Sequence, residues 1–380
     1  MKALLGLVIA VGGLNVARVE GQAKEFALPP IQTAGYDDHA RFQVNGKPFF
    51  PILLYGAPIE DDAVLAQCCE FGFNVLTCRP DAAEPLAAKG FYAAVHGTKN
   101  VVGISSMLLA VGADSPALYF KKDLLAQTAE ANAKSSAAIP SRPVMNAIGY
   151  WEDEPAGVIA GKLPAKALYE DLVAAIDVSA PYLYPVPYQP IASVGEAVAR
   201  ARQATGGKKP ILPILQLFAW EAAARYPTPD ELRCMTFLAL VEGASGIGYY
   251  TYKPVTGHPK ATLPEIQPEL WQSVKQLNRE VAELGPLLLE GEGKEPSTVV
   301  LAPGSAAAVK FKASGRNGGF PAVVVNSSPL PQEVKLVFSG KEKAAQFVLS
   351  GDRALDVRDG AAALSLEPFE VVVVRRAIAP

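Results

Sequence analysis

Histidine and cysteine are scarce in this chain of 380 residues. It has three histidines and four cysteines, and no HxH, HExxH or CxxC spacing occurs. Zinc sites are built from such closely spaced ligands, so the sequence argues against a metal centre. We expect Cys68, Cys69, Cys78 and Cys234 to be small buried side chains. A disulfide of Cys68 or Cys69 with Cys78 is the alternative.

Charge is sparse as well. Charged residues make up 19% of the chain, the net charge is −3, and no long basic run occurs. These numbers exclude a nucleic acid or an anionic membrane surface as the expected partner. Half of the residues are hydrophobic, which excludes disorder as the main state.

The N-terminus lacks a hydrophobic run of membrane-spanning length. An apolar stretch of about 12 residues follows Met-Lys, too short to cross a bilayer comfortably. Small residues near Gly21–Ala23 complete the pattern of a secretory signal peptide. We predict a signal peptide over 1–23, cleaved after Ala23, and a secreted or periplasmic protein without membrane association after cleavage. A buried N-terminal helix is the alternative.

The chain then alternates buried strands with amphipathic helices, which is typical of a parallel α/β fold. Apolar runs predict strands, and the helical patterns between them end at Gly72 and Gly90 or begin at Thr228-Pro229. An Asn45-Gly46 pair predicts a hairpin before the first strand. An eighth strand is expected within 99–106 or 155–163. The seven strands that the pattern locates are 49–55, 73–78, 91–96, 144–151, 180–184, 211–218 and 246–252.

The pattern changes near residue 291. The segment 291–296 is polar and rich in breakers, as a linker is. After it, short strands with a period of two predict an antiparallel β-sandwich. We therefore expect a TIM (β/α)8-type barrel over 24–290, followed by a small antiparallel β-sandwich domain over 296–380.

The active site of such barrels lies at the carboxyl ends of the strands. The residues expected there are rich in carboxylates and aromatic rings. Rings stack on the apolar faces of sugars, and carboxylates supply the acid and base for glycosidic cleavage. The candidates for substrate binding are Tyr55, Arg79, His96, Trp151, Tyr182, Tyr184, Gln216, Trp220 and Tyr250, and those for catalysis are Glu154, Asp153 and Glu221.

Several motifs, in this order, resemble those of clan-A-type glycoside hydrolases with a C-terminal β-sandwich. The run 42–51 is similar to the approach to the first barrel strand, and 149–155 (GYWEDEP) to the end of the fourth. The run 177–185 is similar to the sixth strand, and 226–250 to the last helix and strand. Leu366–Val371 resembles the final strand of the sandwich.

The resemblance implies that Glu154, which precedes a proline, is the general acid or acid/base. Asp153 beside it would raise the pKa of Glu154 or orient the substrate. In such barrels a nucleophilic Glu ends the seventh strand, but Gln216 stands at that place. Glutamine cannot form a glycosyl-enzyme ester, so Glu221 or Asp153 is the candidate for the second carboxylate.

The function expected is therefore a secreted glycoside hydrolase-like enzyme that cleaves a poly- or oligosaccharide without a cofactor. Two alternatives stay open: a catalytically inactive glycan-binding barrel, and a substrate-assisted N-acetylhexosaminidase-like hydrolase in which an N-acetyl group attacks. A lyase with Arg79 holding a uronic acid is a further rival. A deacetylase is disfavoured by the few histidines, because such enzymes usually need a metal.

Overall fold

The computed structural model describes residues 27–112, 123–150, 169–220, 224–253, 261–290, 299–315, 319–339, 347–349 and 354–376. The proposed signal peptide lies outside these residues. The boundary between the two domains is expected within 291–298, which also lies outside the described residues. Both domain limits therefore stay predictions.

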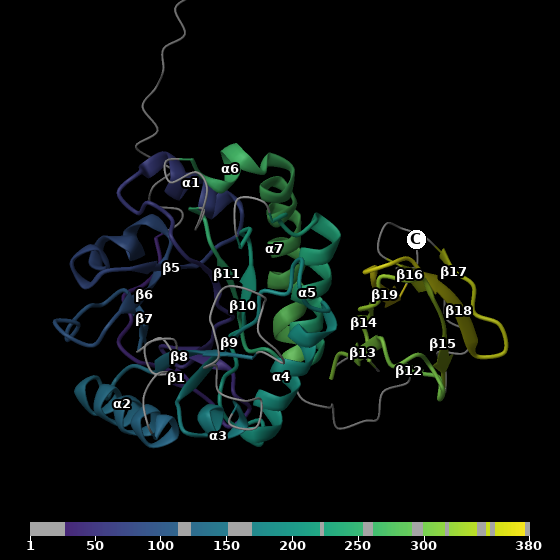
Figure 1. The fold of residues 1–380 in the computed structure, drawn as a ribbon, viewed down its shortest axis with the longest axis horizontal. Helices are drawn as coiled ribbons and strands as arrows, with labels where there is room; N and C mark the ends of the chain where they lie inside the picture. Colours follow the sequence, from purple (N-terminus) through teal and green to yellow (C-terminus); the bar gives the residue numbers. More distant parts are fainter. Residues whose placement is uncertain are drawn as a thin grey trace, which may run out of the picture.

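Eight parallel strands close into a barrel, as the alternation of strand and helix predicted (Figure 1). In chain order they are β4 (Ile52–Leu54), β5 (Val75–Cys78), β6 (Tyr92–His96), β7 (Met107–Val111), β8 (Val144–Gly149), β9 (Val178–Tyr182), β10 (Ile214–Gln216) and β11 (Ile247–Tyr250). The last strand pairs with the first, Ile247 opposite Ile52, which leaves no open edge.

The strand that the sequence did not locate is β7. It lies just beyond the suggested segment 99–106, and its five residues, Met107–Val111, are all buried. No helix separates it from β6, because 97–106 forms turns and irregular backbone. An interpretation that relies on the alternation of strands and helices misses a strand that no helix precedes. As a result, the segment 144–149 is the fifth barrel strand and not the fourth.

Helices cover the outside of the barrel. They are α1 (Asp62–Glu70), α2 (Leu124–Ala138), α3 (Tyr169–Ala174), α4 (Ala192–Ala204), α5 (Pro229–Val241), α6 (Leu263–Ile266) and α7 (Pro268–Leu289). The predicted start of α5 is confirmed, since Thr228 and Glu231 form a capping box with Pro229 at the first helical position. The helix that was expected to end at Gly90 is instead two 3₁₀ turns, η1 (Pro80–Ala82) and η2 (Glu84–Lys89), each with a proline in its first turn.

A small antiparallel sheet closes the amino-terminal end of the barrel. It consists of β1 (Ala34–Tyr36), β2 (Phe42–Val44) and β3 (Lys47–Pro48). The predicted hairpin is confirmed: Asn45 and Gly46 connect β2 to β3 with φ of 50° and 74°, as a type I′ turn requires. Phe42 and Val44 pack with Leu53, Leu108 and other residues of the barrel interior.

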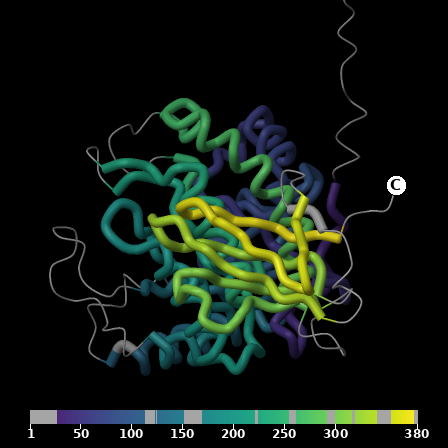
Figure 2. The backbone as a smooth tube through the Cα atoms, turned by 90° about the vertical axis from the view of Figure 1, so that its right-hand side faces the viewer, coloured from purple at the N-terminus to yellow at the C-terminus, as the bar shows by residue number. Residues whose placement is uncertain are grey.

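The C-terminal strands form a sandwich of two sheets. One sheet is β12 (Val299–Leu301), β15 (Gln332–Phe338) and β18 (Ala361–Leu366). The other is β13 (Val309–Ala313), β14 (Ala322–Asn326), β19 (Val371–Arg376), β16 (Phe347–Leu349) and β17 (Ala354–Leu355). Figure 2 shows its green and yellow strands lying across one side of the barrel.

The sandwich packs against the barrel through β14 and β19. Ala322 and Val324 lie in the sandwich core, while Val323 and Val325 join the barrel's outer core, and β19 alternates in the same way. These two strands are therefore apolar on both faces. Polar contacts also cross the interface: Arg233 of α5 donates to the carbonyl of Val371 at 2.7 Å.

The four cysteines are free thiols. Cys68, Cys78 and Cys234 are buried and Cys69 is half-buried, as the sequence predicted, and the alternative disulfide does not form. Burial raises the pKa of the Cys68 and Cys78 thiols to about 12. In the described part of the chain, no helix is both long and apolar enough to cross a membrane.

Candidate functional site

Five of the predicted site residues come together at the carboxyl end of the barrel. Tyr55 follows β4, while His96, Tyr182, Gln216 and Tyr250 each end a strand. Strand register places neighbours level with one another, since Gln216 pairs with Tyr250 across β10 and β11. Parallel strands carry their last residues to the same rim, and this is the rim where barrel enzymes have their sites.

Aromatic side chains form a continuous network across this rim. Tyr250 lies between two parts of it, with its ring centroid 5.6 Å from that of Tyr55 and 5.8 Å from that of Tyr184. Tyr184 in turn contacts Trp220 at 5.8 Å. We call the whole set the aromatic network: Tyr55, Tyr182, Tyr184, Phe218, Trp220 and Tyr250.

The network is buried on one side and open on the other. Tyr55 and Phe218 are almost fully buried, at 9% and 3% exposure. Tyr182, Tyr184, Trp220 and Tyr250 are half-buried. Half-buried rings held by buried ones present fixed apolar faces beside polar groups, which is the arrangement that stacks on a sugar ring.

Sequence reasoning did not select Phe218, although its ring contacts Tyr184, Trp220 and Tyr250. The signal that could have found it is spacing. Tyr182 and Tyr184 are two residues apart, as are Phe218 and Trp220, and in extended backbone such pairs point to the same side.

His96 extends the network on the β6 side. Its ring lies 6.3 Å from that of Tyr55, edge to face, and the residue is exposed. Desolvation of the ring lowers the pKa of His96 below its usual value. The ring is therefore neutral at pH 7, with one nitrogen that donates a hydrogen bond and one that accepts.

Gln216 ends β10 inside the rim, and its side chain is fully buried. Nε2 donates to the carbonyls of Val186, at 2.8 Å, and Phe218, at 3.0 Å. Oε1 accepts from the backbone N–H of Val186 at 2.9 Å. The predicted contact of Gln216 with substrate stays a prediction, and both of its amide donors are already used by the backbone.

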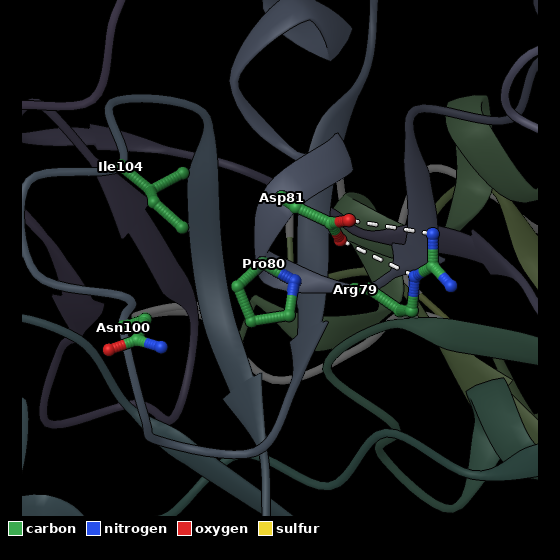
Figure 3. Close-up of a pocket in the computed structure, with 5 residues that line it drawn as sticks. All are labelled: Arg79, Pro80, Asp81, Asn100 and Ile104. Carbon is green, nitrogen blue, oxygen red and sulfur yellow. Dashed lines mark hydrogen bonds and ion pairs between the residues drawn. The ribbon is translucent and has the colours of Figure 1, made fainter.

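Arg79 stands apart from the aromatic network, beside η1. Its Nε lies 3.3 Å from Asp81 Oδ1, and 80% of its side chain is exposed. The pair borders a pocket that Pro80, Asn100 and Ile104 complete (Figure 3). The segment between β6 and β7 therefore supplies one side of this pocket through Asn100 and Ile104.

No family model and no curated protein matches this chain. Solved structures do match its fold. A glycoside hydrolase of family 5 from Bacteroides vulgatus superposes on 90% of this chain and 93% of that chain, with 11% identity and a TM-score of 0.50. This chain has the fold of the clan-A-type glycoside hydrolases.

Two further matches are weaker. An endo-β-1,4-mannanase from Thermotoga petrophila covers 88% of this chain and 99% of that chain, with 9% identity and a TM-score of 0.39. A β-galactosidase from Marinomonas ef1 covers 64% and 63%, with 9% identity and a TM-score of 0.48. At these identities the likeness concerns the fold alone, and the resemblance that the motifs indicated rests on the family 5 structure.

The predicted catalytic residues of this glycoside hydrolase-type barrel lie outside the described residues. Glu154 and Asp153 follow β8, and Glu221 follows Trp220; Trp151, predicted to bind substrate, also lies outside the described residues. Their roles stay predictions. The strand count changes one argument for them, because 149–155 follows the fifth strand and not the fourth. Glu154 keeps its place after a barrel strand, but it does not occupy the position from which the resemblance assigned its role.

Within the described residues, no group of three or more His, Cys, Asp or Glu side chains is arranged to hold a metal ion.

Proposed function

We propose that this protein is a secreted glycoside hydrolase that acts on a poly- or oligosaccharide. The observation that carries the proposal is the aromatic network at the carboxyl end of a glycoside hydrolase-type barrel. Its half-buried rings offer stacking faces at the end of the barrel where chemistry takes place. His96 and the pocket beside Arg79 add polar groups for sugar hydroxyls.

In this proposal Glu154 protonates the leaving oxygen. Asp153 is its neighbour in sequence, and a second negative charge raises the pKa of a carboxyl, so that it keeps its proton near neutral pH. Glu221 or Asp153 activates a water or orients the substrate. Trp151 and Trp220 lie next to these carboxylates in sequence and stack on the bound sugar.

The test is a broad glycan panel with three proteins. Wild type is expected to release sugars, and Glu154→Gln to be slower by about 10²- to 10⁴-fold, the usual contribution of a general acid. Glu130→Gln is the matched control, since Glu130 is an exposed residue of α2 paired with Lys134, and it is expected to cleave like wild type. Equal rates for Glu154→Gln and wild type would contradict the assignment.

Gln216 favours a second candidate, a glycan-binding barrel without hydrolysis. It stands at the end of the seventh strand, where such barrels hold a nucleophilic carboxylate, and its amide is bonded to backbone on both sides. In that case wild type and Glu154→Gln bind the same glycan equally well, and neither cleaves any member of the panel.

Secretion has its own test. We propose that residues 1–23 are removed on export, so N-terminal sequencing of the exported protein is expected to begin at Lys24. A mature protein that retains Met1 would contradict this part of the proposal.

A further inference from the structure

Two loops meet beside the end of β10. One follows β9 and carries Tyr184 and Val186, and the other follows β10 and carries Phe218 and Trp220. Gln216 and Val186 exchange two hydrogen bonds, 2.8 and 2.9 Å long, in the way that two backbone amides do in a sheet. The side chain thus lets β10 pair with a loop that is too irregular to continue as a strand.

One further bond holds the loop after β10 against its own strand, and another joins the two loops. Gln216 Nε2 donates to the carbonyl of Phe218 at 3.0 Å, and Trp220 Nε1 donates to the carbonyl of Tyr184 at 2.9 Å. The rings of Tyr184 and Trp220 are held 5.8 Å apart at 64°. Every polar atom of the Gln216 amide takes part in this connection, and none of its side chain is exposed.

We propose that Gln216 is a positioning residue, which fixes the angle between the Tyr184 and Trp220 rings so that together they bind a sugar. This inference rests on the proposed function, because it concerns the same site. It replaces the idea that Gln216 is a mutated nucleophile or a substrate contact. A ligand reaches the rings, and Gln216 acts on it only through them.

The surroundings of Gln216 also disfavour a working carboxylate at this place. Its Nε2 faces two carbonyl oxygens at 2.8 and 3.0 Å. An ionised oxygen there would be buried against two acceptors and would have no donor, which is strongly unfavourable. In Gln216→Glu the new carboxyl can therefore keep the connection only in its neutral form, and the two loops separate once it ionises at higher pH.

The experiment compares Gln216→Glu with Gln203→Glu, the same change at an exposed position of α4. A glycan that wild type binds is titrated into each protein from pH 5 to 9. A neutral carboxyl at position 216 can still donate one bond and accept one, so affinity at pH 5 is expected to be near that of wild type. Ionisation breaks the connection, and affinity is expected to fall by about tenfold or more at pH 9, the effect of losing one to two hydrogen bonds.

Gln203→Glu is expected to follow wild type at every pH. Three outcomes overturn the proposal: faster cleavage by Gln216→Glu than by wild type, unchanged affinity of Gln216→Glu from pH 5 to 9, or a loss that is the same at every pH. The first restores the nucleophile interpretation, and the last indicates damage to the fold without a positioning role.

A second measurement uses the wild type alone and does not depend on folding of the variant. Both Gln216 side-chain NH protons are expected to exchange slowly with solvent and to keep their NMR shifts when glycan is added, while the Trp220 indole signal shifts. Rapid exchange of the Gln216 protons would contradict the proposal. If no glycan binds at all, the proposed function fails, but the exchange rates still decide whether Gln216 connects the loops.

Discussion

The two ends of the barrel are built from the same kinds of residue and differ in what covers them. At the amino-terminal end, Phe42 is fully buried beneath the β1–β3 sheet. Arg142 joins the N-terminal segment to the barrel at that end, because it donates hydrogen bonds to the carbonyls of Met107 and Ile31 at 2.7 and 2.8 Å. At the carboxyl end, the rings of Tyr184 and Trp220 pack just as closely but remain half-buried.

This difference separates the aromatic residues that serve the fold from those that are available to a ligand. A barrel needs its interior filled at both ends. The carboxyl end of this one leaves several neighbouring aromatic faces partly in water, which is unfavourable for residues with no other role. Substitutions at the sealed end should therefore change stability, and substitutions at the open end should change binding.

The largest effect is expected for Phe42→Ala at the sealed end. Removal of a fully buried ring leaves a cavity and costs about 3–5 kcal/mol of unfolding free energy. Urea denaturation measures the loss, and glycan affinity of the remaining folded protein is expected to match wild type. A large loss of affinity with little loss of stability would erase the distinction between the two ends.

A smaller effect is expected for Trp220→Leu at the open end. Loss of one stacking face weakens glycan binding by about 0.5–1.5 kcal/mol, or roughly 2- to 12-fold. Titration calorimetry measures it. Tyr92→Phe is the matched change at the sealed end, where Tyr92 donates to the carbonyl of Pro29 at 3.0 Å. That variant is expected to bind like wild type, and equal losses in both variants would refute the comparison.

The smallest effect is expected at His96 and depends on pH. Desolvation lowers the pKa of His96 in the folded protein. The unfolded chain therefore binds the proton first as pH drops below about 6.5, and stability is lost there and not above it. The unfolding free energies of wild type and His96→Gln are expected to differ by a constant above pH 7. Below about pH 6.5 wild type loses stability relative to the variant. A relative gain by wild type at low pH would show that a partner stabilises the cation.

The sequence was informative where local rules decide the structure. The Asn45-Gly46 turn and the Thr228-Pro229 helix start follow from backbone preferences that packing does not override. It was less informative where packing decides. The strand Met107–Val111 was missed because no helix precedes it. The packing of β14 between the sandwich core and α5, which makes this strand apolar on both faces, was not predicted either.

The site shows the same division. Strand ends predicted which tyrosines gather at the rim, since the closed barrel brings all its carboxyl ends together. The bonds of Gln216 could not be predicted, because they join residues 30 positions apart through a loop without regular structure. The strand count placed Glu154 one strand too early for the same reason that β7 was missed.

Tyrosines at both ends of the barrel allow a direct test of which end binds the ligand. With tyrosine rings labelled for NMR, an oligosaccharide that the protein binds is added in steps, and each ring signal is followed. Tyr184 and Tyr250 at the open rim are expected to shift on binding, while Tyr92 and Tyr36 at the sealed end are not. A shift of Tyr92 without any shift of Tyr184 and Tyr250 would place the ligand at the opposite end of the barrel and contradict the proposed site.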